Sequence, residues 1–292
     1  MRTRRIVFEV AGDAVVGDLY LPAITSSFPA AIVAGPMTSV KEQVTGTYAR
    51  ALAERGVAAL AIDHRHFGES DGVPRQYEHH GRKVEDLRAG ITALSADAAV
   101  DATRIGAVGV CLGAGYAATA AADDFRVRAL AMIAGYYRDP MEMRARDPFA
   151  FDARIAEGRE ARELYETMGK VRMVPAAALH VDAAMQTRDT VDYYTRRAAV
   201  DNYRNAFAVM SREYFLPFDV QSAAPRLRMP TLMLHSEQAL SPVWARRFHD
   251  AISAPKRLEW IVSCGQTDIY DDPVIVEHAC DAVAAHLHAV LA

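Results

Sequence analysis

Cys111 lies in a sequence pattern that suits nucleophilic chemistry. The residues GVCLG at positions 109–113 join an apolar run, 105–110, to an alanine-rich run, 112–122. This order predicts a sharp turn between a strand and a helix, with the cysteine at its tip. A helix N-terminus favours the thiolate over the thiol, and the Leu112 N–H is free to bind an oxyanion. The alternative is a small buried cysteine that only fills space.

Short apolar runs predict the strands that must hold this turn in place. They lie at residues 30–34, 57–62, 105–110, 127–134, 231–234 and 258–262. Segments with helical periodicity separate most of them, and this alternation predicts an α/β fold with a mostly parallel sheet and helices on both faces. Two further runs, 6–10 and 15–21, flank a turn and predict an N-terminal hairpin at the sheet edge.

The alternation of strands and helices is interrupted between residues 136 and 225. This interval shows helical patterns without a convincing strand, and it holds 12 of the 22 Tyr and Phe residues. We therefore expect a helical cap, 136–225, inserted into a core made of residues 1–135 and 226–292. Many of the aromatic side chains must pack the cap on the core, and the others are expected to line a ligand pocket.

Segments spread over nearly the whole chain resemble a known family. They are residues 35–43, 63–72, 109–116 and 270–273. They resemble bacterial α/β-hydrolases related to dienelactone hydrolases and to X-Pro dipeptidyl peptidases, in which the nucleophile elbow carries a Cys or a Ser. The resemblance implies the α/β-hydrolase fold, with Cys111 as the nucleophile.

The resemblance also implies the partners of Cys111. In this family the loop after the strand at 30–34 completes the oxyanion hole, so Met37 or Thr38 would act together with Leu112. The catalytic acid follows the next-to-last strand, where Glu237 is the best match. A solvated loop carboxylate is an equal alternative for Glu237.

The chain departs from the family pattern at two positions. Aligned without a gap, Gln266 stands where the catalytic base, a His, belongs. Glutamine cannot take up and release a proton near pH 7, but it can hold a water, donate to an anion or orient a carbonyl. His66 replaces a Gly of the pattern in a loop after a strand end, where it could supply the missing base. A hydrogen-bonded loop histidine is the more common role there.

Composition limits the classes of molecule that the protein is expected to bind. The formal net charge of −4 comes without a basic stripe, so nucleic acid is not expected, and no apolar run is long enough to cross a membrane. Cys111, Cys264 and Cys280 are too few for a disulfide framework and lack metal-ligand spacing. We expect a cytoplasmic protein with a small-molecule substrate and no cofactor or metal, and a homodimer is left open.

These observations favour an enzyme that uses Cys111 on an acyl substrate. An ester, thioester or lactone of moderately apolar or aromatic character would suit the predicted pocket, with an atypical triad that lacks the base. Two alternatives stay open. One is a cyclase, isomerase or C–C lyase of a biosynthetic pathway, and the other is a catalytically silent binding protein.

Overall fold

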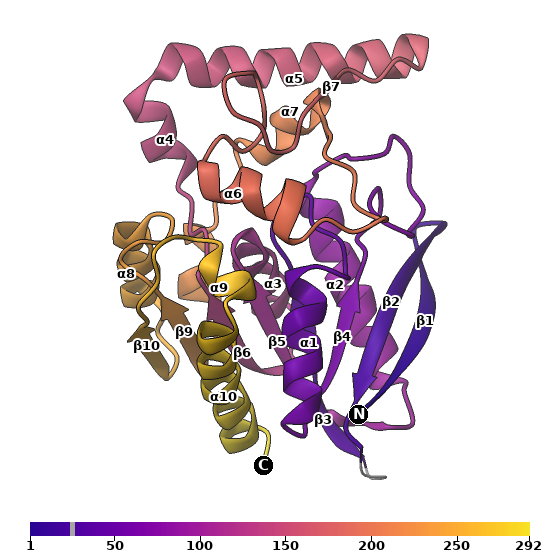
Figure 1. Ribbon diagram of the computed structural model, residues 1–292, viewed down its shortest axis with the longest axis vertical. Helices are drawn as coiled ribbons and strands as arrows, with labels where there is room; N and C mark the ends of the chain where they lie inside the picture. The colour runs from indigo at the N-terminus through magenta and orange to yellow at the C-terminus, as the bar shows by residue number, and fades with distance from the viewer. Residues whose placement is uncertain (24–26) are drawn as a thin grey trace.

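The structure, a computed structural model, describes residues 1–23 and 27–292, and its centre is one eight-stranded sheet (Figure 1). The strand order is β1-β2-β4-β3-β5-β6-β9-β10. The bounds are Arg2–Val10 (β1), Asp13–Leu21 (β2), Phe28–Ala34 (β3), Ala58–Ile62 (β4), Val100–Val110 (β5), Val127–Ile133 (β6), Thr231–His235 (β9) and Lys256–Trp260 (β10). The two N-terminal strands run antiparallel to their neighbours and the others are parallel. The predicted mostly parallel sheet with a hairpin edge is confirmed.

Burial explains why the apolar runs form the central strands. Every residue of β3 and of β4 is buried, as a parallel sheet covered on both faces requires. The edge strand β1 is largely exposed and carries arginines at positions 2, 4 and 5. Charged side chains on an edge strand oppose pairing with another chain, so this edge can stay open.

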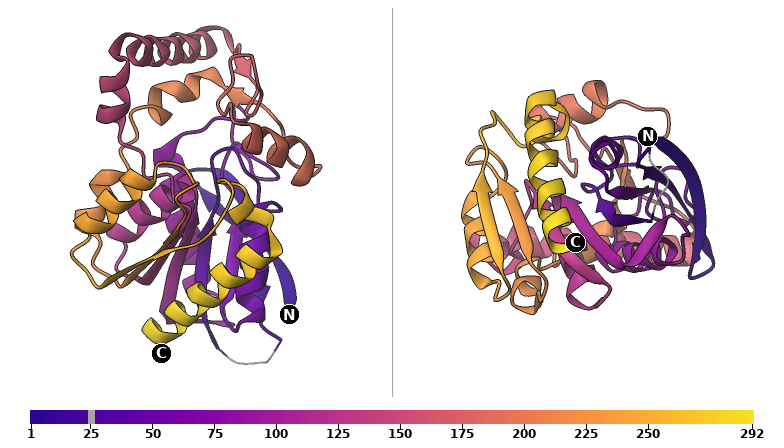
Figure 2. Two further views of the ribbon diagram at one scale, coloured as in Figure 1. Left: turned by 60° about the vertical axis from the view of Figure 1, so that its left-hand side comes forward. Right: turned by 90° about the horizontal axis from the view of Figure 1, so that it is seen from below.

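Helices pack on both faces of the sheet (Figure 2). On one face α1 (Val44–Glu54) contacts α10 (Pro273–Val290), and on the other α2 (His80–Ser95) contacts α3 (Leu112–Ala122). The remaining core helices are α8 (Pro242–Ala251) and the short α9 (Asp268–Asp271). Among the described residues, none of the helices combines the length and the apolar character needed to cross a lipid bilayer.

Residues 136–225, called here the inserted segment, connect β6 to β9 and lie over one end of the sheet (Figures 1 and 2). The segment contains α4 (Pro140–Arg146), α5 (Pro148–Met168), α6 (Arg188–Asp192), α7 (Arg212–Phe215), a π-helix (Tyr193–Arg197) and two 3₁₀ helices (Val209–Ser211 and Gln221–Arg226). Its described strands, β7 (Met173–Val174) and β8 (Phe207–Ala208), pair only with each other. The segment adds no strand to the eight-stranded sheet, while its role as a cap with these borders stays a prediction.

Candidate active site

The turn between β5 and α3 places Cys111 in a backbone conformation that few L-residues adopt. Its φ is 57° and its ψ is −125°. A Cβ at Gly109 would come within 2.5 Å of the Ala114 Cα, and one at Gly113 within 2.2 Å of the Ala34 oxygen. The turn therefore needs both glycines, and the strained backbone at Cys111 is the kind that clusters at functional sites.

The Cys111 thiol is buried beside groups that can donate hydrogen bonds to it. Burial raises the pKa of the thiol to about 11, while the Tyr270 hydroxyl, the Leu112 N–H and the Gln266 amide act to lower it. Burial has the larger effect, so the protonated thiol is favoured at neutral pH. The Leu112 N–H at the N-terminus of α3 favours the thiolate, but burial opposes it with the larger effect on the pKa.

Gln266 is held in one orientation by hydrogen bonds to three neighbours. Its Nε2 donates to the Ala134 carbonyl at 2.8 Å and to the Tyr270 hydroxyl at 3.0 Å, and its Oε1 accepts from the Leu240 N–H at 2.9 Å. Because the Tyr270 oxygen already accepts a hydrogen bond, its proton is available for the Cys111 sulfur. Gln266 thus acts on the thiol partly through Tyr270.

Of the two residues expected in the oxyanion hole, the structure favours Met37. The Thr38 N–H donates to Glu78 Oε2 at 2.8 Å and is therefore occupied. The Met37 side chain lines the cavity beside Cys111, and the Met37 N–H has no acceptor among the described residues. Of these two residues, only Met37 thus keeps the unpaired N–H that the expected oxyanion hole requires.

The structure does not bring Glu237 to Cys111. The Glu237 side chain is 55% exposed and pairs with Arg246 on the surface. The Gln266 amide, which this acid would have to orient, is fixed by backbone groups and Tyr270 instead. The assignment of Glu237 as catalytic acid is therefore corrected, because its side chain points to solvent.

His66 also lies away from the thiol. Its Nδ1 lies 2.9 Å from the Pro74 carbonyl and its Nε2 lies 2.8 Å from an Arg82 nitrogen. Burial and the Arg82 charge lower the pKa of His66 to about 4. His66 does not line the cavity at Cys111, so it is not placed to act as the missing base.

A cavity of about 270 Å³ opens at Cys111 between the sheet and the inserted segment. Its lining is mostly apolar and aromatic: Pro36, Met37, Cys111, Leu112, Tyr136, Arg138, Met143, Ala184, Met185, Gln186, Thr187, Thr190, Tyr194, Phe215, Leu216, Leu240, Gln266 and Tyr270. Among these described lining residues there is no His, Asp or Glu. These lining residues therefore offer a thiol, hydrogen-bond donors and a cation, but no ordinary base.

Sequence reasoning missed two residues of this cavity, Tyr270 and Arg138. Tyr270 stood in one of the segments that resemble the family, and its spacing of four from Gln266 is the signal that could have paired them. Arg138 lies among the aromatic residues that open the inserted segment and gives no signal in the sequence. Only the fold shows that it reaches the cavity.

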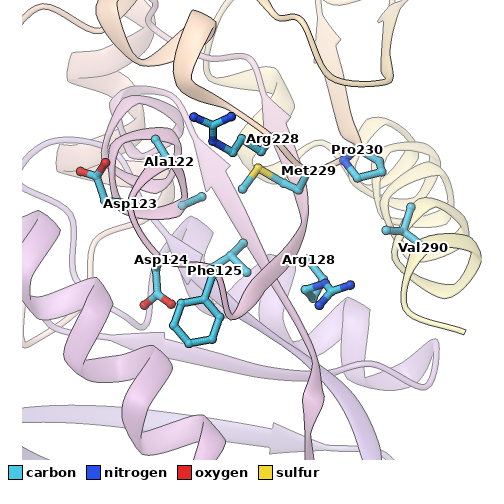
Figure 3. Close-up of a pocket in the computed structure, with 11 residues that line it drawn as sticks. Ala122, Asp123, Asp124, Phe125, Arg128, Arg228, Met229, Pro230 and Val290 are labelled. Carbon is cyan, nitrogen blue, oxygen red and sulfur yellow. The ribbon is translucent and has the colours of Figure 1, made fainter.

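A larger cavity, of about 630 Å³, lies at the opposite end of the sheet (Figure 3). It is formed by the end of α3, the start of β6 and residues 228–230. Its carboxylates are already paired, Asp123 with Arg88 and Arg226, and Asp124 with Arg126. Among its described lining residues there is no Cys, His or Ser, so it lacks the groups for nucleophilic catalysis.

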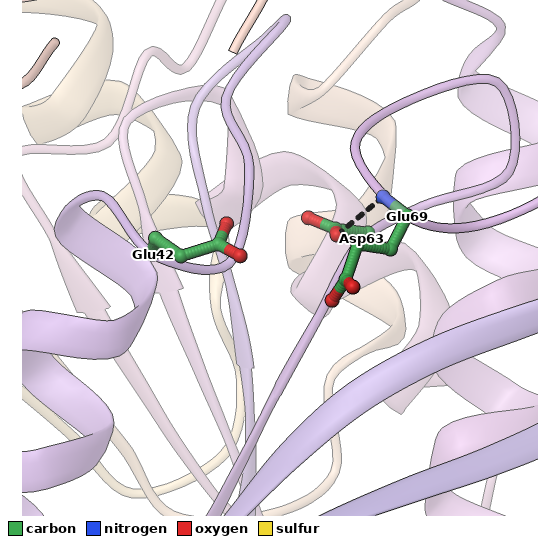
Figure 4. A group of neighbouring side chains, drawn as sticks. All are labelled: Glu42, Asp63 and Glu69. Atoms are coloured by element: carbon green, nitrogen blue, oxygen red, sulfur yellow. Dashed lines mark hydrogen bonds between the residues drawn. The ribbon is translucent and has the colours of Figure 1, made fainter. Parts of the chain in front are cut away.

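Three carboxylates that could bind a cation, those of Glu42, Asp63 and Glu69, lie close together near β4 (Figure 4). The Lys41 ammonium contacts all three, at 2.6 Å from Glu42, 3.2 Å from Asp63 and 2.6 Å from Glu69. Asp63 also accepts the Glu69 N–H at 2.9 Å. The lysine supplies the positive charge that a metal ion would bring, so the cluster is a structural ion-pair network.

Comparison with known proteins identifies the family of this protein. The chain belongs to the α/β-hydrolase family described as serine aminopeptidase, S33, whose model matches residues 38–263. It is similar to the uncharacterized protein YcjY of Escherichia coli (strain K12), with 32% identity over 89% of this chain and 88% of that protein. It is also similar to the acyltransferase drtE of Aspergillus calidoustus, with 27% identity over 78% of this chain and 76% of that protein.

The fold has solved counterparts. The structure of DcsB in complex with its substrate analogue superposes with a TM-score of 0.85 and 20% identity, covering 99% of both chains. At this identity the likeness shows the fold alone. The expected α/β-hydrolase fold is thereby confirmed, and the family includes both hydrolases and acyltransferases.

Proposed function

We propose that the protein is an acyl-transfer enzyme that uses Cys111 to attack the carbonyl of a thioester, ester or lactone. The observation that carries this proposal is the position of Cys111 on a positive-φ turn in the wall of a cavity that Met37 and Leu112, the expected N–H donors, also line. A sulfur nucleophile next to two N–H donors is the arrangement that stabilises a tetrahedral oxyanion.

A thioester suits this site best among the three substrate types. The Cys111 sulfur forms a bond to the acyl carbon, the carbon–sulfur bond of the substrate breaks, and the Cys111 proton leaves with the departing thiol. A departing thiolate needs less help from an acid than an alkoxide does. The exchange therefore needs little of the acid–base assistance that a catalytic histidine would provide. The Tyr270 hydroxyl can donate a hydrogen bond to the sulfur.

The second half of the reaction depends on the acceptor. Water attacking the acyl-enzyme would meet no His, Asp or Glu among the described lining residues, so hydrolysis would be slow. An amine or a thiol needs less assistance, and the relative named as an acyltransferase supports transfer. The same lack of a base favours the second candidate, a non-hydrolytic cyclase, isomerase or C–C lyase.

Intact-protein mass spectrometry tests the proposal. The wild type, Cys111→Ala and the control Cys264→Ala are mixed with an activated thioester and an activated ester. We expect one added acyl group in the wild type and in Cys264→Ala, and none in Cys111→Ala. Adding water alone, an amine or a thiol then shows which acceptor removes the acyl group. An unchanged acyl adduct in Cys111→Ala would reject Cys111 as the nucleophile.

A further inference from the structure

Arg138 is a buried cation in the wall of the Cys111 cavity. Its side chain is completely inaccessible to solvent, and it lines the same cavity as the thiol. Nη1 donates to the Phe215 carbonyl at 2.6 Å, and Nη2 donates to the Leu216 carbonyl at 3.0 Å. Nε has no hydrogen-bond partner among the described residues. The guanidinium is thus held in place while one of its strong donors stays unused.

The charge of Arg138 has no carboxylate partner among residues 1–23 and 27–292. The other buried Lys and Arg side chains do have one: Lys41 pairs with Asp63, Arg65 with Asp86, Lys83 with Glu78 and Arg212 with Asp182. The Phe215 ring, 4.2 Å from the guanidinium carbon, compensates the charge in part. Arginine remains protonated in proteins, and a buried unpaired charge is costly. Among the buried Lys and Arg side chains that the structure describes, Arg138 is therefore the exception.

We propose that Arg138 binds a free carboxylate on the acyl group whose activated end is attacked by Cys111. The substrate class is then the monothioester or monoester of a short dicarboxylic acid, and this assignment rests on the proposed acyl chemistry. Nε is unused, and the contact of Nη2 with the Met143 sulfur, at 3.5 Å, is to a weak acceptor. A carboxylate can replace the sulfur and accept from both nitrogens, the bidentate geometry that arginine favours.

The size and lining of the cavity suit a short acyl chain with a reactive carbonyl at one end and a carboxylate at the other. Its volume of about 270 Å³ is at the small end of ligand sites. Cys111 and Arg138 both line it, and the aliphatic part of the chain would contact apolar side chains such as Met143 and Phe215. A neutral acyl chain would fill the same space and leave the guanidinium without a partner.

Binding without chemistry is the first arm of the test. Calorimetry or thermal shift with adipate, and with hexanoate as the matched monocarboxylate, needs no acyl transfer. We expect adipate to bind and stabilise Cys111→Ala, and Arg138→Gln to weaken adipate binding about 10–100-fold. The control Arg144→Gln, at an exposed arginine paired with Asp152, should bind adipate as before. Equal adipate binding by Arg138→Gln and the wild type would overturn the proposal.

Specificity in turnover is the second arm. The substrates are the nitrophenyl esters of adipate and of hexanoate, and the measured quantity is the ratio of their kcat/KM values. We expect the wild type to prefer the adipate monoester, and Arg138→Gln to lower this ratio about 10–100-fold. A structural role of Arg138 would slow both esters equally, and an unchanged ratio would overturn the proposal.

A second variant covers the case in which Arg138→Gln does not fold. Met143→Glu places a carboxylate beside the guanidinium, and we expect it to lower the adipate-to-hexanoate ratio of kcat/KM at least as far as Arg138→Gln does, whatever it does to either rate alone. A retained adipate preference in this variant would count against Arg138 as the anion site. If adipate binding depends on Arg138 but neither ester acylates Cys111, the anion site stands and the proposed acyl chemistry fails.

Discussion

Two buried regions of this protein differ in whether their charged side chains have partners of opposite charge. In the first region, Glu78 lies wholly inside the protein, 2.8 Å from Lys83, and also accepts hydrogen bonds from Tyr116 and the Thr38 N–H. In the second, the wall of the Cys111 cavity, Arg138 has no carboxylate partner in the described chain. In the first region the charges are paired by groups of the chain itself, whereas in the second the charge of Arg138 is left for the carboxylate that we propose as its ligand. Whether a buried charge has an opposite charge as partner thus distinguishes a structural role from the ligand-binding role that we propose for Arg138.

The largest expected effect on stability comes from removing a partner in the paired region around Glu78. Lys83→Met leaves the Glu78 carboxylate without its cation and should lower the free energy of unfolding by ~3–5 kcal/mol. Arg138→Gln, which removes no partner of a buried carboxylate, should change it by less than ~2 kcal/mol. Urea denaturation of the two variants makes the comparison. Equal losses would mean that Arg138 is as fully compensated as Lys83.

The pH dependence of thiol reactivity tests how strongly burial affects ionisation at Cys111. Because burial raises the pKa of this thiol to about 11, protonation is favoured in the folded protein, and the alkylation rate should rise about tenfold per pH unit up to that value. Near neutral pH the exposed Cys264 should react with iodoacetamide before Cys111. Peptide mapping after brief treatment measures both. Faster labelling of Cys111 at neutral pH would show that the helix N-terminus outweighs burial.

The smallest expected effect is on ester hydrolysis by Gln266→His. A general base contributes ~10²–10⁴-fold when it is well oriented. Here the gain should stay below ~10²-fold, because Glu237, the acid expected to orient the new ring, is exposed and paired with Arg246. Steady-state kinetics on nitrophenyl esters gives the gain. Adding Glu237→Gln to this variant should change nothing, and a further loss of activity would restore Glu237 as the acid partner.

Local patterns in the sequence predicted the sheet and the elbow, because the need for glycine at 109 and 113 and the burial of the strands arise from near neighbours. The catalytic partners depend on how distant segments meet. Glu237 follows the expected strand but points to solvent, and His66 turns toward Arg82 instead of the thiol. Gln266 was predicted to replace the base, and the structure places it within reach of the thiol. Arg138 could not be recognised, because a missing ion pair is visible only in three dimensions.

Arg138 also ties together the two ends of the inserted segment. Its guanidinium donates to the carbonyls of Phe215 and Leu216, and its own carbonyl accepts the Val220 N–H at 3.2 Å. The residues between these points form a loop whose ends are already joined, and the free-energy cost of lengthening such a loop grows only slowly with its length. Insertions and deletions between α4 and α7 can therefore change the part of the cavity lining that comes from the inserted segment, while the sheet and the turn at Cys111 keep their conformation. The residue proposed to select the substrate also gives the fold a site at which new selectivities can evolve.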